Sequence, residues 1–140
     1  MSEPLTEKLL DDLLSSPDPQ AYFSSHEDMQ RSVSDYLQDL LDAHGMKRSE
    51  AIRASELNET YAYQLFAGQR KNPSRDKILQ LVFGMRLSLL EADRLMKIAG
   101  VSPLYCKNRR DAIIIFCVNK GCSLQKTNEE LFRFDEKTIS

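Results

Sequence analysis

Apolar residues recur at helical spacing in one short segment after another, and this pattern restricts the fold more than any other feature. The first strong instance follows the spacing i, i+3, i+4, i+7 and i+8, with Val33, Tyr36, Leu37, Leu40 and Leu41. Side chains at this spacing share one face of an α-helix. No segment of useful length alternates apolar and polar residues, as a half-buried strand does. The sequence therefore predicts an all-α fold.

Capping residues separate the apolar segments. Ser and Asn favour helix starts, and Gly favours helix ends. The predicted caps and ends are Ser32 or Ser34, Gly45, Asn58, Gly68, Ser74, Ser88 and Gly100. Between them we expect a helix from residue 33, short helices over 47–54 and 59–67, and helices after Ser74 and Ser88. Residues 33–102 thus read as one five-helix domain.

The sequence repeats itself at an offset of 35 residues. Residues 75–79 (Arg-Asp-Lys-Ile-Leu) and 87–89 (Leu-Ser-Leu) are echoed by 110–114 (Arg-Asp-Ala-Ile-Ile) and 122–124 (Cys-Ser-Leu). The second copy has strand-forming β-branched residues, but two copies of one helical hairpin explain the echo better. The alternative is a chance similarity between two amphipathic pairs. We predict helices from Asp111 to Val118 and after Ser123, which make 103–140 a C-terminal helical hairpin.

The first 32 residues form an acidic arm. Its helical face consists of Leu5, Leu9, Leu10, Leu13 and Leu14. Pro17 and Pro19 end that helix. The segment that follows, to about residue 31, carries Tyr22, Phe23 and Met29, and we expect these side chains to pack against other apolar groups.

Charge is distributed unevenly along the chain, although the formal net charge is only −2. Residues 1–44 carry ten acidic and two basic residues, whereas 45–110 carry thirteen basic and six acidic residues. A basic centre beside an acidic first third favours a polyanionic partner. No apolar run is long enough for a membrane helix, and no signal peptide is recognisable at the start. A cytoplasmic location with no membrane contact is the expectation.

Cysteine and acidic residues give no sign of catalysis. Three cysteines, an odd number, argue against a disulfide framework, and Cys117 and Cys122 lack a second ligand pair for zinc, so we expect no metal. The Asp11-Asp12 pair belongs to a solvated helix face. No glycine-rich phosphate loop and no nucleophile beside a base is present. The chain is expected to be no enzyme and to hold no cofactor.

The two short helices joined by a tight turn have the pattern of a helix-turn-helix. In that motif the first helix crosses the DNA backbone and the second enters the major groove. Leu57 supplies the apolar turn residue and Asn58 the cap. The second helix has small or apolar residues where it would pack, namely Ala62, Leu65 and Phe66. Its outward positions are Glu59, Thr60, Tyr63 and Gln64.

These residues, with Gly45–Ile52 and Leu65–Ser74, resemble the phage-repressor-like (XRE-type) helix-turn-helix family. The resemblance implies a lambda-repressor-like five-helix domain over 33–102. Residues 61–64, 72–77 and 103–112 are similar to a bacterial subgroup with an extra C-terminal helical hairpin. The implied base-facing residues are Glu59, Thr60, Tyr63 and Gln64. The implied phosphate-facing residues are Arg48, Gln69, Arg70, Lys71, Asn72 and Ser74. Double-stranded DNA is the implied partner and transcription regulation the implied function.

Three positions depart from the family pattern. Ile52 replaces a usual alanine, Glu56 replaces the usual turn glycine, and Glu59 places a carboxylate near phosphates. These departures favour an alternative, in which a degenerate scaffold serves as a protein-interaction, antitoxin-like or anti-defence module with a protein partner. For the DNA-binding interpretation we expect a homodimer, because paired half-sites mirror a two-fold axis. Its contact would be the C-terminal hairpin or the leucine helix at 5–14.

Overall fold

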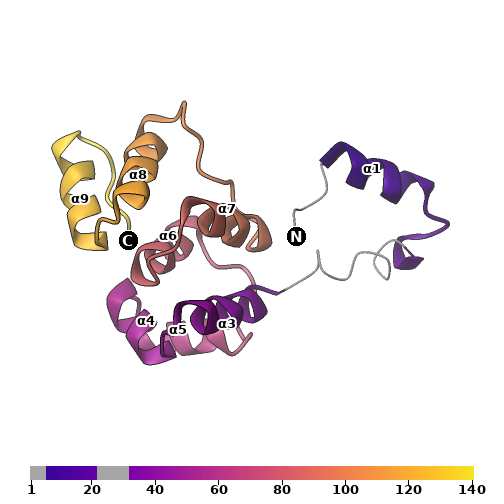
Figure 1. The fold of residues 1–140 in the computed structure, drawn as a ribbon, viewed down its shortest axis with the longest axis horizontal. Helices are drawn as coiled ribbons and strands as arrows, with labels where there is room; N and C mark the ends of the chain where they lie inside the picture. Colours follow the sequence, from indigo (N-terminus) through magenta and orange to yellow (C-terminus); the bar gives the residue numbers. More distant parts are fainter. Residues whose placement is uncertain (1–5, 22–31) are drawn as a thin grey trace. The chain divides into compact units, whose positions relative to one another are not determined.

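The computed structural model describes residues 6–21 and 32–140, and the regular elements in these ranges are helices (Figure 1). No strand occurs in either range, so the all-α prediction is confirmed for the described chain. The chain divides into two compact units, Met1–Arg31 and Ser32–Ser140. None of the described helices has the length and apolar character that a membrane span requires.

The first unit contains α1 (Thr6–Ser15), whose leucine side chains Leu10, Leu13 and Leu14 are exposed. Of the predicted leucine face, Leu5 and the side chain of Leu9 lie outside the described part of the chain. The predicted packing of Tyr22, Phe23 and Met29 also falls outside the described residues.

The second unit begins with α3 (Val33–His44), which has the predicted apolar face. Ser32, rather than Ser34, caps this helix, since its hydroxyl accepts a hydrogen bond from the Asp35 N–H at 3.2 Å. The buried face is Val33, Leu37, Leu40 and Leu41, whereas Tyr36 is half-buried. Gly45 ends the helix in the left-handed conformation, with φ 60°. At the same end, His44 Nε2 lies 3.0 Å from a Glu91 carboxylate oxygen.

Four short helices follow α3. They are α4 (Arg48–Ser55), α5 (Glu59–Phe66), α6 (Arg75–Gly84) and α7 (Leu89–Ile98). α4 lies one residue later than predicted and α5 ends one residue earlier, which is the usual uncertainty of a helix boundary. The predicted caps Ser74 and Ser88 both accept a backbone N–H, and Ser88 with Glu91 forms a complete capping box.

One continuous apolar core joins all helices of the second unit. The fully buried side chains include Leu37 on α3, Leu65 on α5, Leu81 on α6, Leu95 on α7 and Ile114 on α8 (Arg109–Lys120). α6 is buried along most of its length. Burying large aliphatic side chains contributes about 1.5–3 kcal/mol each. The core therefore holds α3–α7 and the C-terminal helices together as one unit.

α8 and α9 (Leu124–Arg133) form the predicted C-terminal hairpin. α8 begins two residues earlier than the predicted Asp111, because Asn108 acts as the cap and accepts the Asp111 N–H at 2.9 Å. Ser123 caps α9 as predicted.

The 35-residue repeat is also present in the backbone. In the connection after α6, the Leu87 N–H donates to the Val82 carbonyl at 3.0 Å. The equivalent bond after α8, from Cys122 to Cys117, is also 3.0 Å. Left-handed residues occur at the same repeat positions, Arg86 and Gly121 after the first helices, and Gly100 and Asp135 after the second. The two helical hairpins therefore have equivalent helices, turns and backbone hydrogen bonds.

Candidate nucleic-acid interface

The turn between α4 and α5 carries an unusual residue. Glu56 adopts the left-handed conformation, with φ 58° and ψ 23°. A side chain in this conformation costs roughly 1–2 kcal/mol, which glycine avoids. Leu57 is buried under the turn, and the Asn58 side chain caps α5 by accepting the Tyr61 N–H at 3.0 Å. The tight turn therefore forms despite the strained glutamate, and the next two residues fix the start of α5.

α5 divides cleanly into two faces. Ala62, Leu65 and Phe66 are buried in the core. On the other side, Glu59, Thr60 and Tyr63 are exposed, and Gln64 is half-buried. This short helix thus presents a carboxylate, a hydroxyl, a phenol and a carboxamide to solvent. Such groups can donate to or accept from base edges.

Two residues of the predicted interface contact each other directly. The Arg70 Nε–H donates to the Gln64 Oε1 at 2.9 Å. The Arg70 guanidinium also lies 5.4 Å from the centroid of the Tyr61 ring. Tyr61 was not among the predicted site residues, yet this stacking holds the loop cation beside α5. A stacked arginine loses less conformational freedom when it binds an anion than a fully mobile one does.

Arg48, at the start of α4, lies against residues of α3 and α5. Its Nη2 donates to the Gln38 Oε1 at 3.3 Å, and its guanidinium lies 5.5 Å from the Phe66 ring centroid. Gln38 was also not predicted as a site residue, because its contact with Arg48 joins α3 to α4. The first helix of the pair therefore contributes a positioned cation of its own.

The loop between α5 and α6 is exposed through Gln69, Arg70, Lys71 and Asn72. Its ends are fixed. The Gln69 N–H donates to the Gln64 carbonyl at 2.9 Å, and the Ser74 hydroxyl accepts the Lys77 N–H at 3.3 Å. Ser74 is therefore first a helix cap. The loop presents two cations and two carboxamides next to the polar face of α5.

Arg75 does not belong to this surface, although it adds to the basic charge of the central segment. Its guanidinium is paired with Asp111 at 2.8 Å. Lys77, in contrast, is half-buried beside Ser74 on the first turn of α6. The net charge of a segment therefore overstates the number of its cations that a polyanion can reach.

The cysteines of the second unit lie in three different environments. Cys106 is exposed, Cys122 is half-buried and Cys117 is buried. Burial raises the pKa of the Cys117 thiol, which keeps it protonated and unreactive near neutral pH. Among the residues that the structure describes, no three His, Cys, Asp or Glu side chains are grouped so that they could hold a metal ion.

The surface thus combines the outward face of α5, the loop at 69–72 and Arg48. Three of its side chains, those of Arg48, Gln64 and Arg70, are engaged with protein partners. Comparisons with protein-family models, with curated proteins and with solved structures give no match to this chain.

Proposed function

We propose that this protein is a sequence-specific DNA-binding regulator of transcription, built on a lambda-repressor-like helix-turn-helix domain of α3–α7. The observation that carries the proposal is the two-faced helix α5. One face is buried in the core, and the other presents hydrogen-bonding side chains beside a cationic loop. The protein then acts in the cytoplasm by binding and has no catalytic role.

In the proposed complex α5 enters the major groove and α4 crosses the backbone. Thr60, Tyr63 and Gln64 face the base edges. Gln64 discriminates through its carboxamide, which pairs well with adenine, and Tyr63 reaches a phosphate or a thymine methyl group. Glu59 accepts from the amino group of a cytosine, the one base contact that makes a carboxylate favourable there.

The loop and α4 supply the phosphate contacts. Arg70 and Lys71 neutralise phosphates, Gln69, Asn72 and Ser74 donate to phosphate oxygens, and Arg48 binds from the other side. Each neutralised phosphate releases counterions, so affinity falls steeply with salt. Reading two half-sites then requires a homodimer, whose two-fold axis matches that of the operator.

Fluorescence anisotropy on genomic and random duplexes at two salt concentrations tests the proposal. We expect the wild-type chain to bind with a strong salt dependence and to prefer some fragments. The double substitution Arg70→Glu and Lys71→Glu should weaken binding at least tenfold, since it replaces two phosphate contacts with repulsion. The matched control, Lys120→Glu with Lys137→Glu, makes the same change in net charge on the C-terminal hairpin and should bind nearly as the wild type does.

Equal losses in both double variants would show only a response to net charge and would remove the loop from the interface. No binding of the wild-type chain at low salt would reject the proposal. Circular dichroism on each variant separates loss of binding from loss of fold.

A protein-interaction module is the second candidate function. The side chains of Phe116 and Phe132 are 61% and 78% exposed, and large apolar groups in this state favour a protein partner. Glu59 at the start of α5 supports the same alternative, because it repels phosphate. Absence of DNA binding together with a specific partner of the C-terminal hairpin would favour this function.

A further inference from the structure

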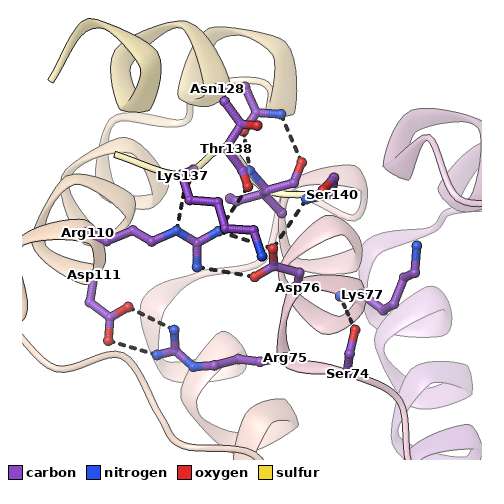
Figure 2. A network of polar contacts seen from close by, with 11 residues as sticks. Ser74, Arg75, Asp76, Lys77, Arg110, Asp111, Asn128, Lys137, Thr138 and Ser140 are labelled. Atoms are coloured by element: carbon purple, nitrogen blue, oxygen red, sulfur yellow. Dashed lines mark hydrogen bonds and ion pairs between the residues drawn. The ribbon is translucent and has the colours of Figure 1, made fainter. Parts of the chain in front are cut away.

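Two ion pairs join the α6–α7 hairpin to the α8–α9 hairpin (Figure 2). In the first, both terminal nitrogens of Arg75 donate to the Asp111 carboxylate at 2.8 Å. In the second, both terminal nitrogens of Arg110 donate to the Asp76 carboxylate at 3.2 and 3.1 Å. Each hairpin therefore contributes one arginine and one aspartate to the interface, and these pair with the aspartate and the arginine of the other hairpin.

The backbone contacts of these side chains repeat in the same way. The Arg75 Nε–H donates to the Ser102 carbonyl at 2.9 Å, and the Arg110 Nε–H donates to the Lys137 carbonyl at 2.8 Å. The donor and the acceptor both shift by 35 residues. A further pair follows the same shift, from Arg75 to the Pro103 carbonyl and from Arg110 to the Thr138 carbonyl, both at 3.2 Å.

Backbone N–H groups complete the aspartate ends of the network. The Tyr105 N–H donates to Asp111 at 3.0 Å, and the Ser140 N–H donates to Asp76 at 3.3 Å. Tyr105 and Ser140 are again 35 residues apart. Each contact that residues 75–105 make to residues 110–140 is thus repeated in the opposite direction by the equivalent residues. Two identical subunits that are related by a two-fold axis contact each other in the same way.

The interface is well shielded from water. Asp111 exposes 7% of its side chain, and the side chains of Asp76 and Arg110 are also mostly covered. Charges in such a place need their matched partners, because leaving a buried charge unpaired is strongly destabilising. A partner on this face must therefore carry an arginine–aspartate pair at the right positions. The second hairpin of this chain meets that requirement.

Only the short segment 106–109 connects the two repeat units. It contains a tight turn, in which the Asn108 N–H donates to the Tyr105 carbonyl at 3.0 Å. Cys106 and Lys107 in this turn are exposed and contribute no contact to the network described above. If the turn opens, the second unit can leave the first while each unit keeps its own helices and its own arginine-to-carbonyl bonds.

We propose that two copies of this protein pair by exchanging their C-terminal hairpins, so that α8–α9 of one copy lies on α6–α7 of the other. The exchanged dimer uses the same reciprocal contacts as the single chain, with the turn at 106–107 as the hinge. Exchange of identical elements is a low-cost route to a dimer, and a short hinge favours it. The inference stands whether or not the protein binds DNA.

Charge complementation between two full-length variants tests the exchange. Asp76→Arg faces Arg110 with an arginine, and Arg110→Asp faces Asp76 with an aspartate, so each variant alone has one repulsive pair. In an exchanged heterodimer the introduced arginine meets the introduced aspartate, and the unchanged Asp76 and Arg110 meet each other. Co-expression should therefore give a heterodimer with about twice the 16.1 kDa mass of one chain. Native mass spectrometry, with one variant isotopically labelled, identifies it.

The matched control is the double variant Asp76→Arg with Arg110→Asp, co-expressed with the wild-type chain. Exchange between these two chains would place like charges together, so no heterodimer should form. Failure of the two single variants to form a heterodimer, whether they remain folded monomers or are lost as unfolded chains, would overturn the proposal.

Deletion of Cys106 and Lys107 provides a second test that leaves all the charges in place. The shortened connection should prevent the hairpin from folding back on its own chain, and light scattering should then report a dimer at all concentrations. A folded monomer of this deletion variant would also overturn the proposal.

Discussion

The α6–α7 and α8–α9 hairpins have the same backbone plan but different outer faces. Leu81 on α6 is fully buried, whereas Phe116, its repeat equivalent on α8, is 61% exposed. Ala99 and its equivalent Phe134 differ in the same direction. The first hairpin is covered by α3–α5, and among the described residues of the second unit no further helices cover the second hairpin in this way. One local structure is thus compatible with two very different surroundings.

The two hairpins differ in what their sequences must provide. Both need a serine cap at the start of their second helix, Ser88 for α7 and Ser123 for α9, and a cap depends only on neighbouring residues. Close packing by a second layer adds a requirement that only the first hairpin meets. At Gly84 an added Cβ would lie 2.6 Å from the Ser55 backbone nitrogen, so α4 and α6 approach closely there. The equivalent residue, Asn119, is exposed and has no such restriction.

The largest expected difference between the hairpins is at Leu81 and Phe116. Leu81→Ala should reduce the free energy of unfolding by about 2–5 kcal/mol, because it leaves a cavity in a packed core. Phe116→Ala removes more atoms but should change it by less than about 0.5 kcal/mol, as surface substitutions do. Denaturant unfolding measures both. Similar losses at the two positions would mean that a layer covers α8 as well.

A smaller difference is expected at Gly84 and Asn119. Gly84→Ala should cost about 1–3 kcal/mol, since the methyl group forces α4 away from α6. Asn119→Ala should be neutral within about 0.5 kcal/mol. Thermal unfolding of the two variants checks the pair. A stabilised Gly84→Ala protein would contradict the close approach of α4 and α6.

The smallest effect concerns the contact between α3 and α7. Burial raises the pKa of Glu91, but the Ser88 N–H and the His44 ring lower it by more, so the pKa lies below its usual value. The ionised Glu91 carboxylate therefore stabilises the fold at neutral pH, and this stabilisation is lost as the pH falls through the lowered pKa. The second hairpin has Lys126 at this position.

Glu91→Gln keeps a hydrogen-bond acceptor for the capping box but removes the charge. The wild-type chain should be more stable than this variant by less than about 1 kcal/mol near pH 7. The difference should disappear once the pH has fallen below the lowered pKa of Glu91. Unfolding measured across this range tests the sign. A difference that grows on acidification would contradict the ionised Glu91.

Local signals made most of the helices predictable. Ser32, Asn58, Ser74, Ser88 and Ser123 all cap helices as expected, because capping depends on the next three residues. The repeat also indicated that Asp111–Val118 is helical, against its strand propensity. The reciprocal pairing of Arg75 with Asp111 was not foreseen. It depends on how two hairpins dock, and no single-segment pattern encodes that.

For the candidate interface, too, the faces of the helix were predictable and the contacts between elements were not. Periodicity separates Thr60 and Tyr63 from the buried Ala62, and the structure has them on opposite sides of α5. The contacts of Arg70 with Tyr61 and of Arg48 with Gln38 depend on side-chain directions across a loop and between helices. Sequence spacing alone does not determine those directions.

The reciprocal hairpin contacts have a consequence for the chain as it is synthesised. The face that carries Arg75 and Asp76 leaves the ribosome 35 residues before its matching hairpin. At synthesis rates of about 5–20 residues per second, the matching hairpin of the same chain is complete roughly 2–7 s after this face. Ribosomes further along the same messenger hold copies in which the matching hairpin has already been made. A nascent chain can therefore take its partner hairpin from the copy beside it, before its own hairpin has been made.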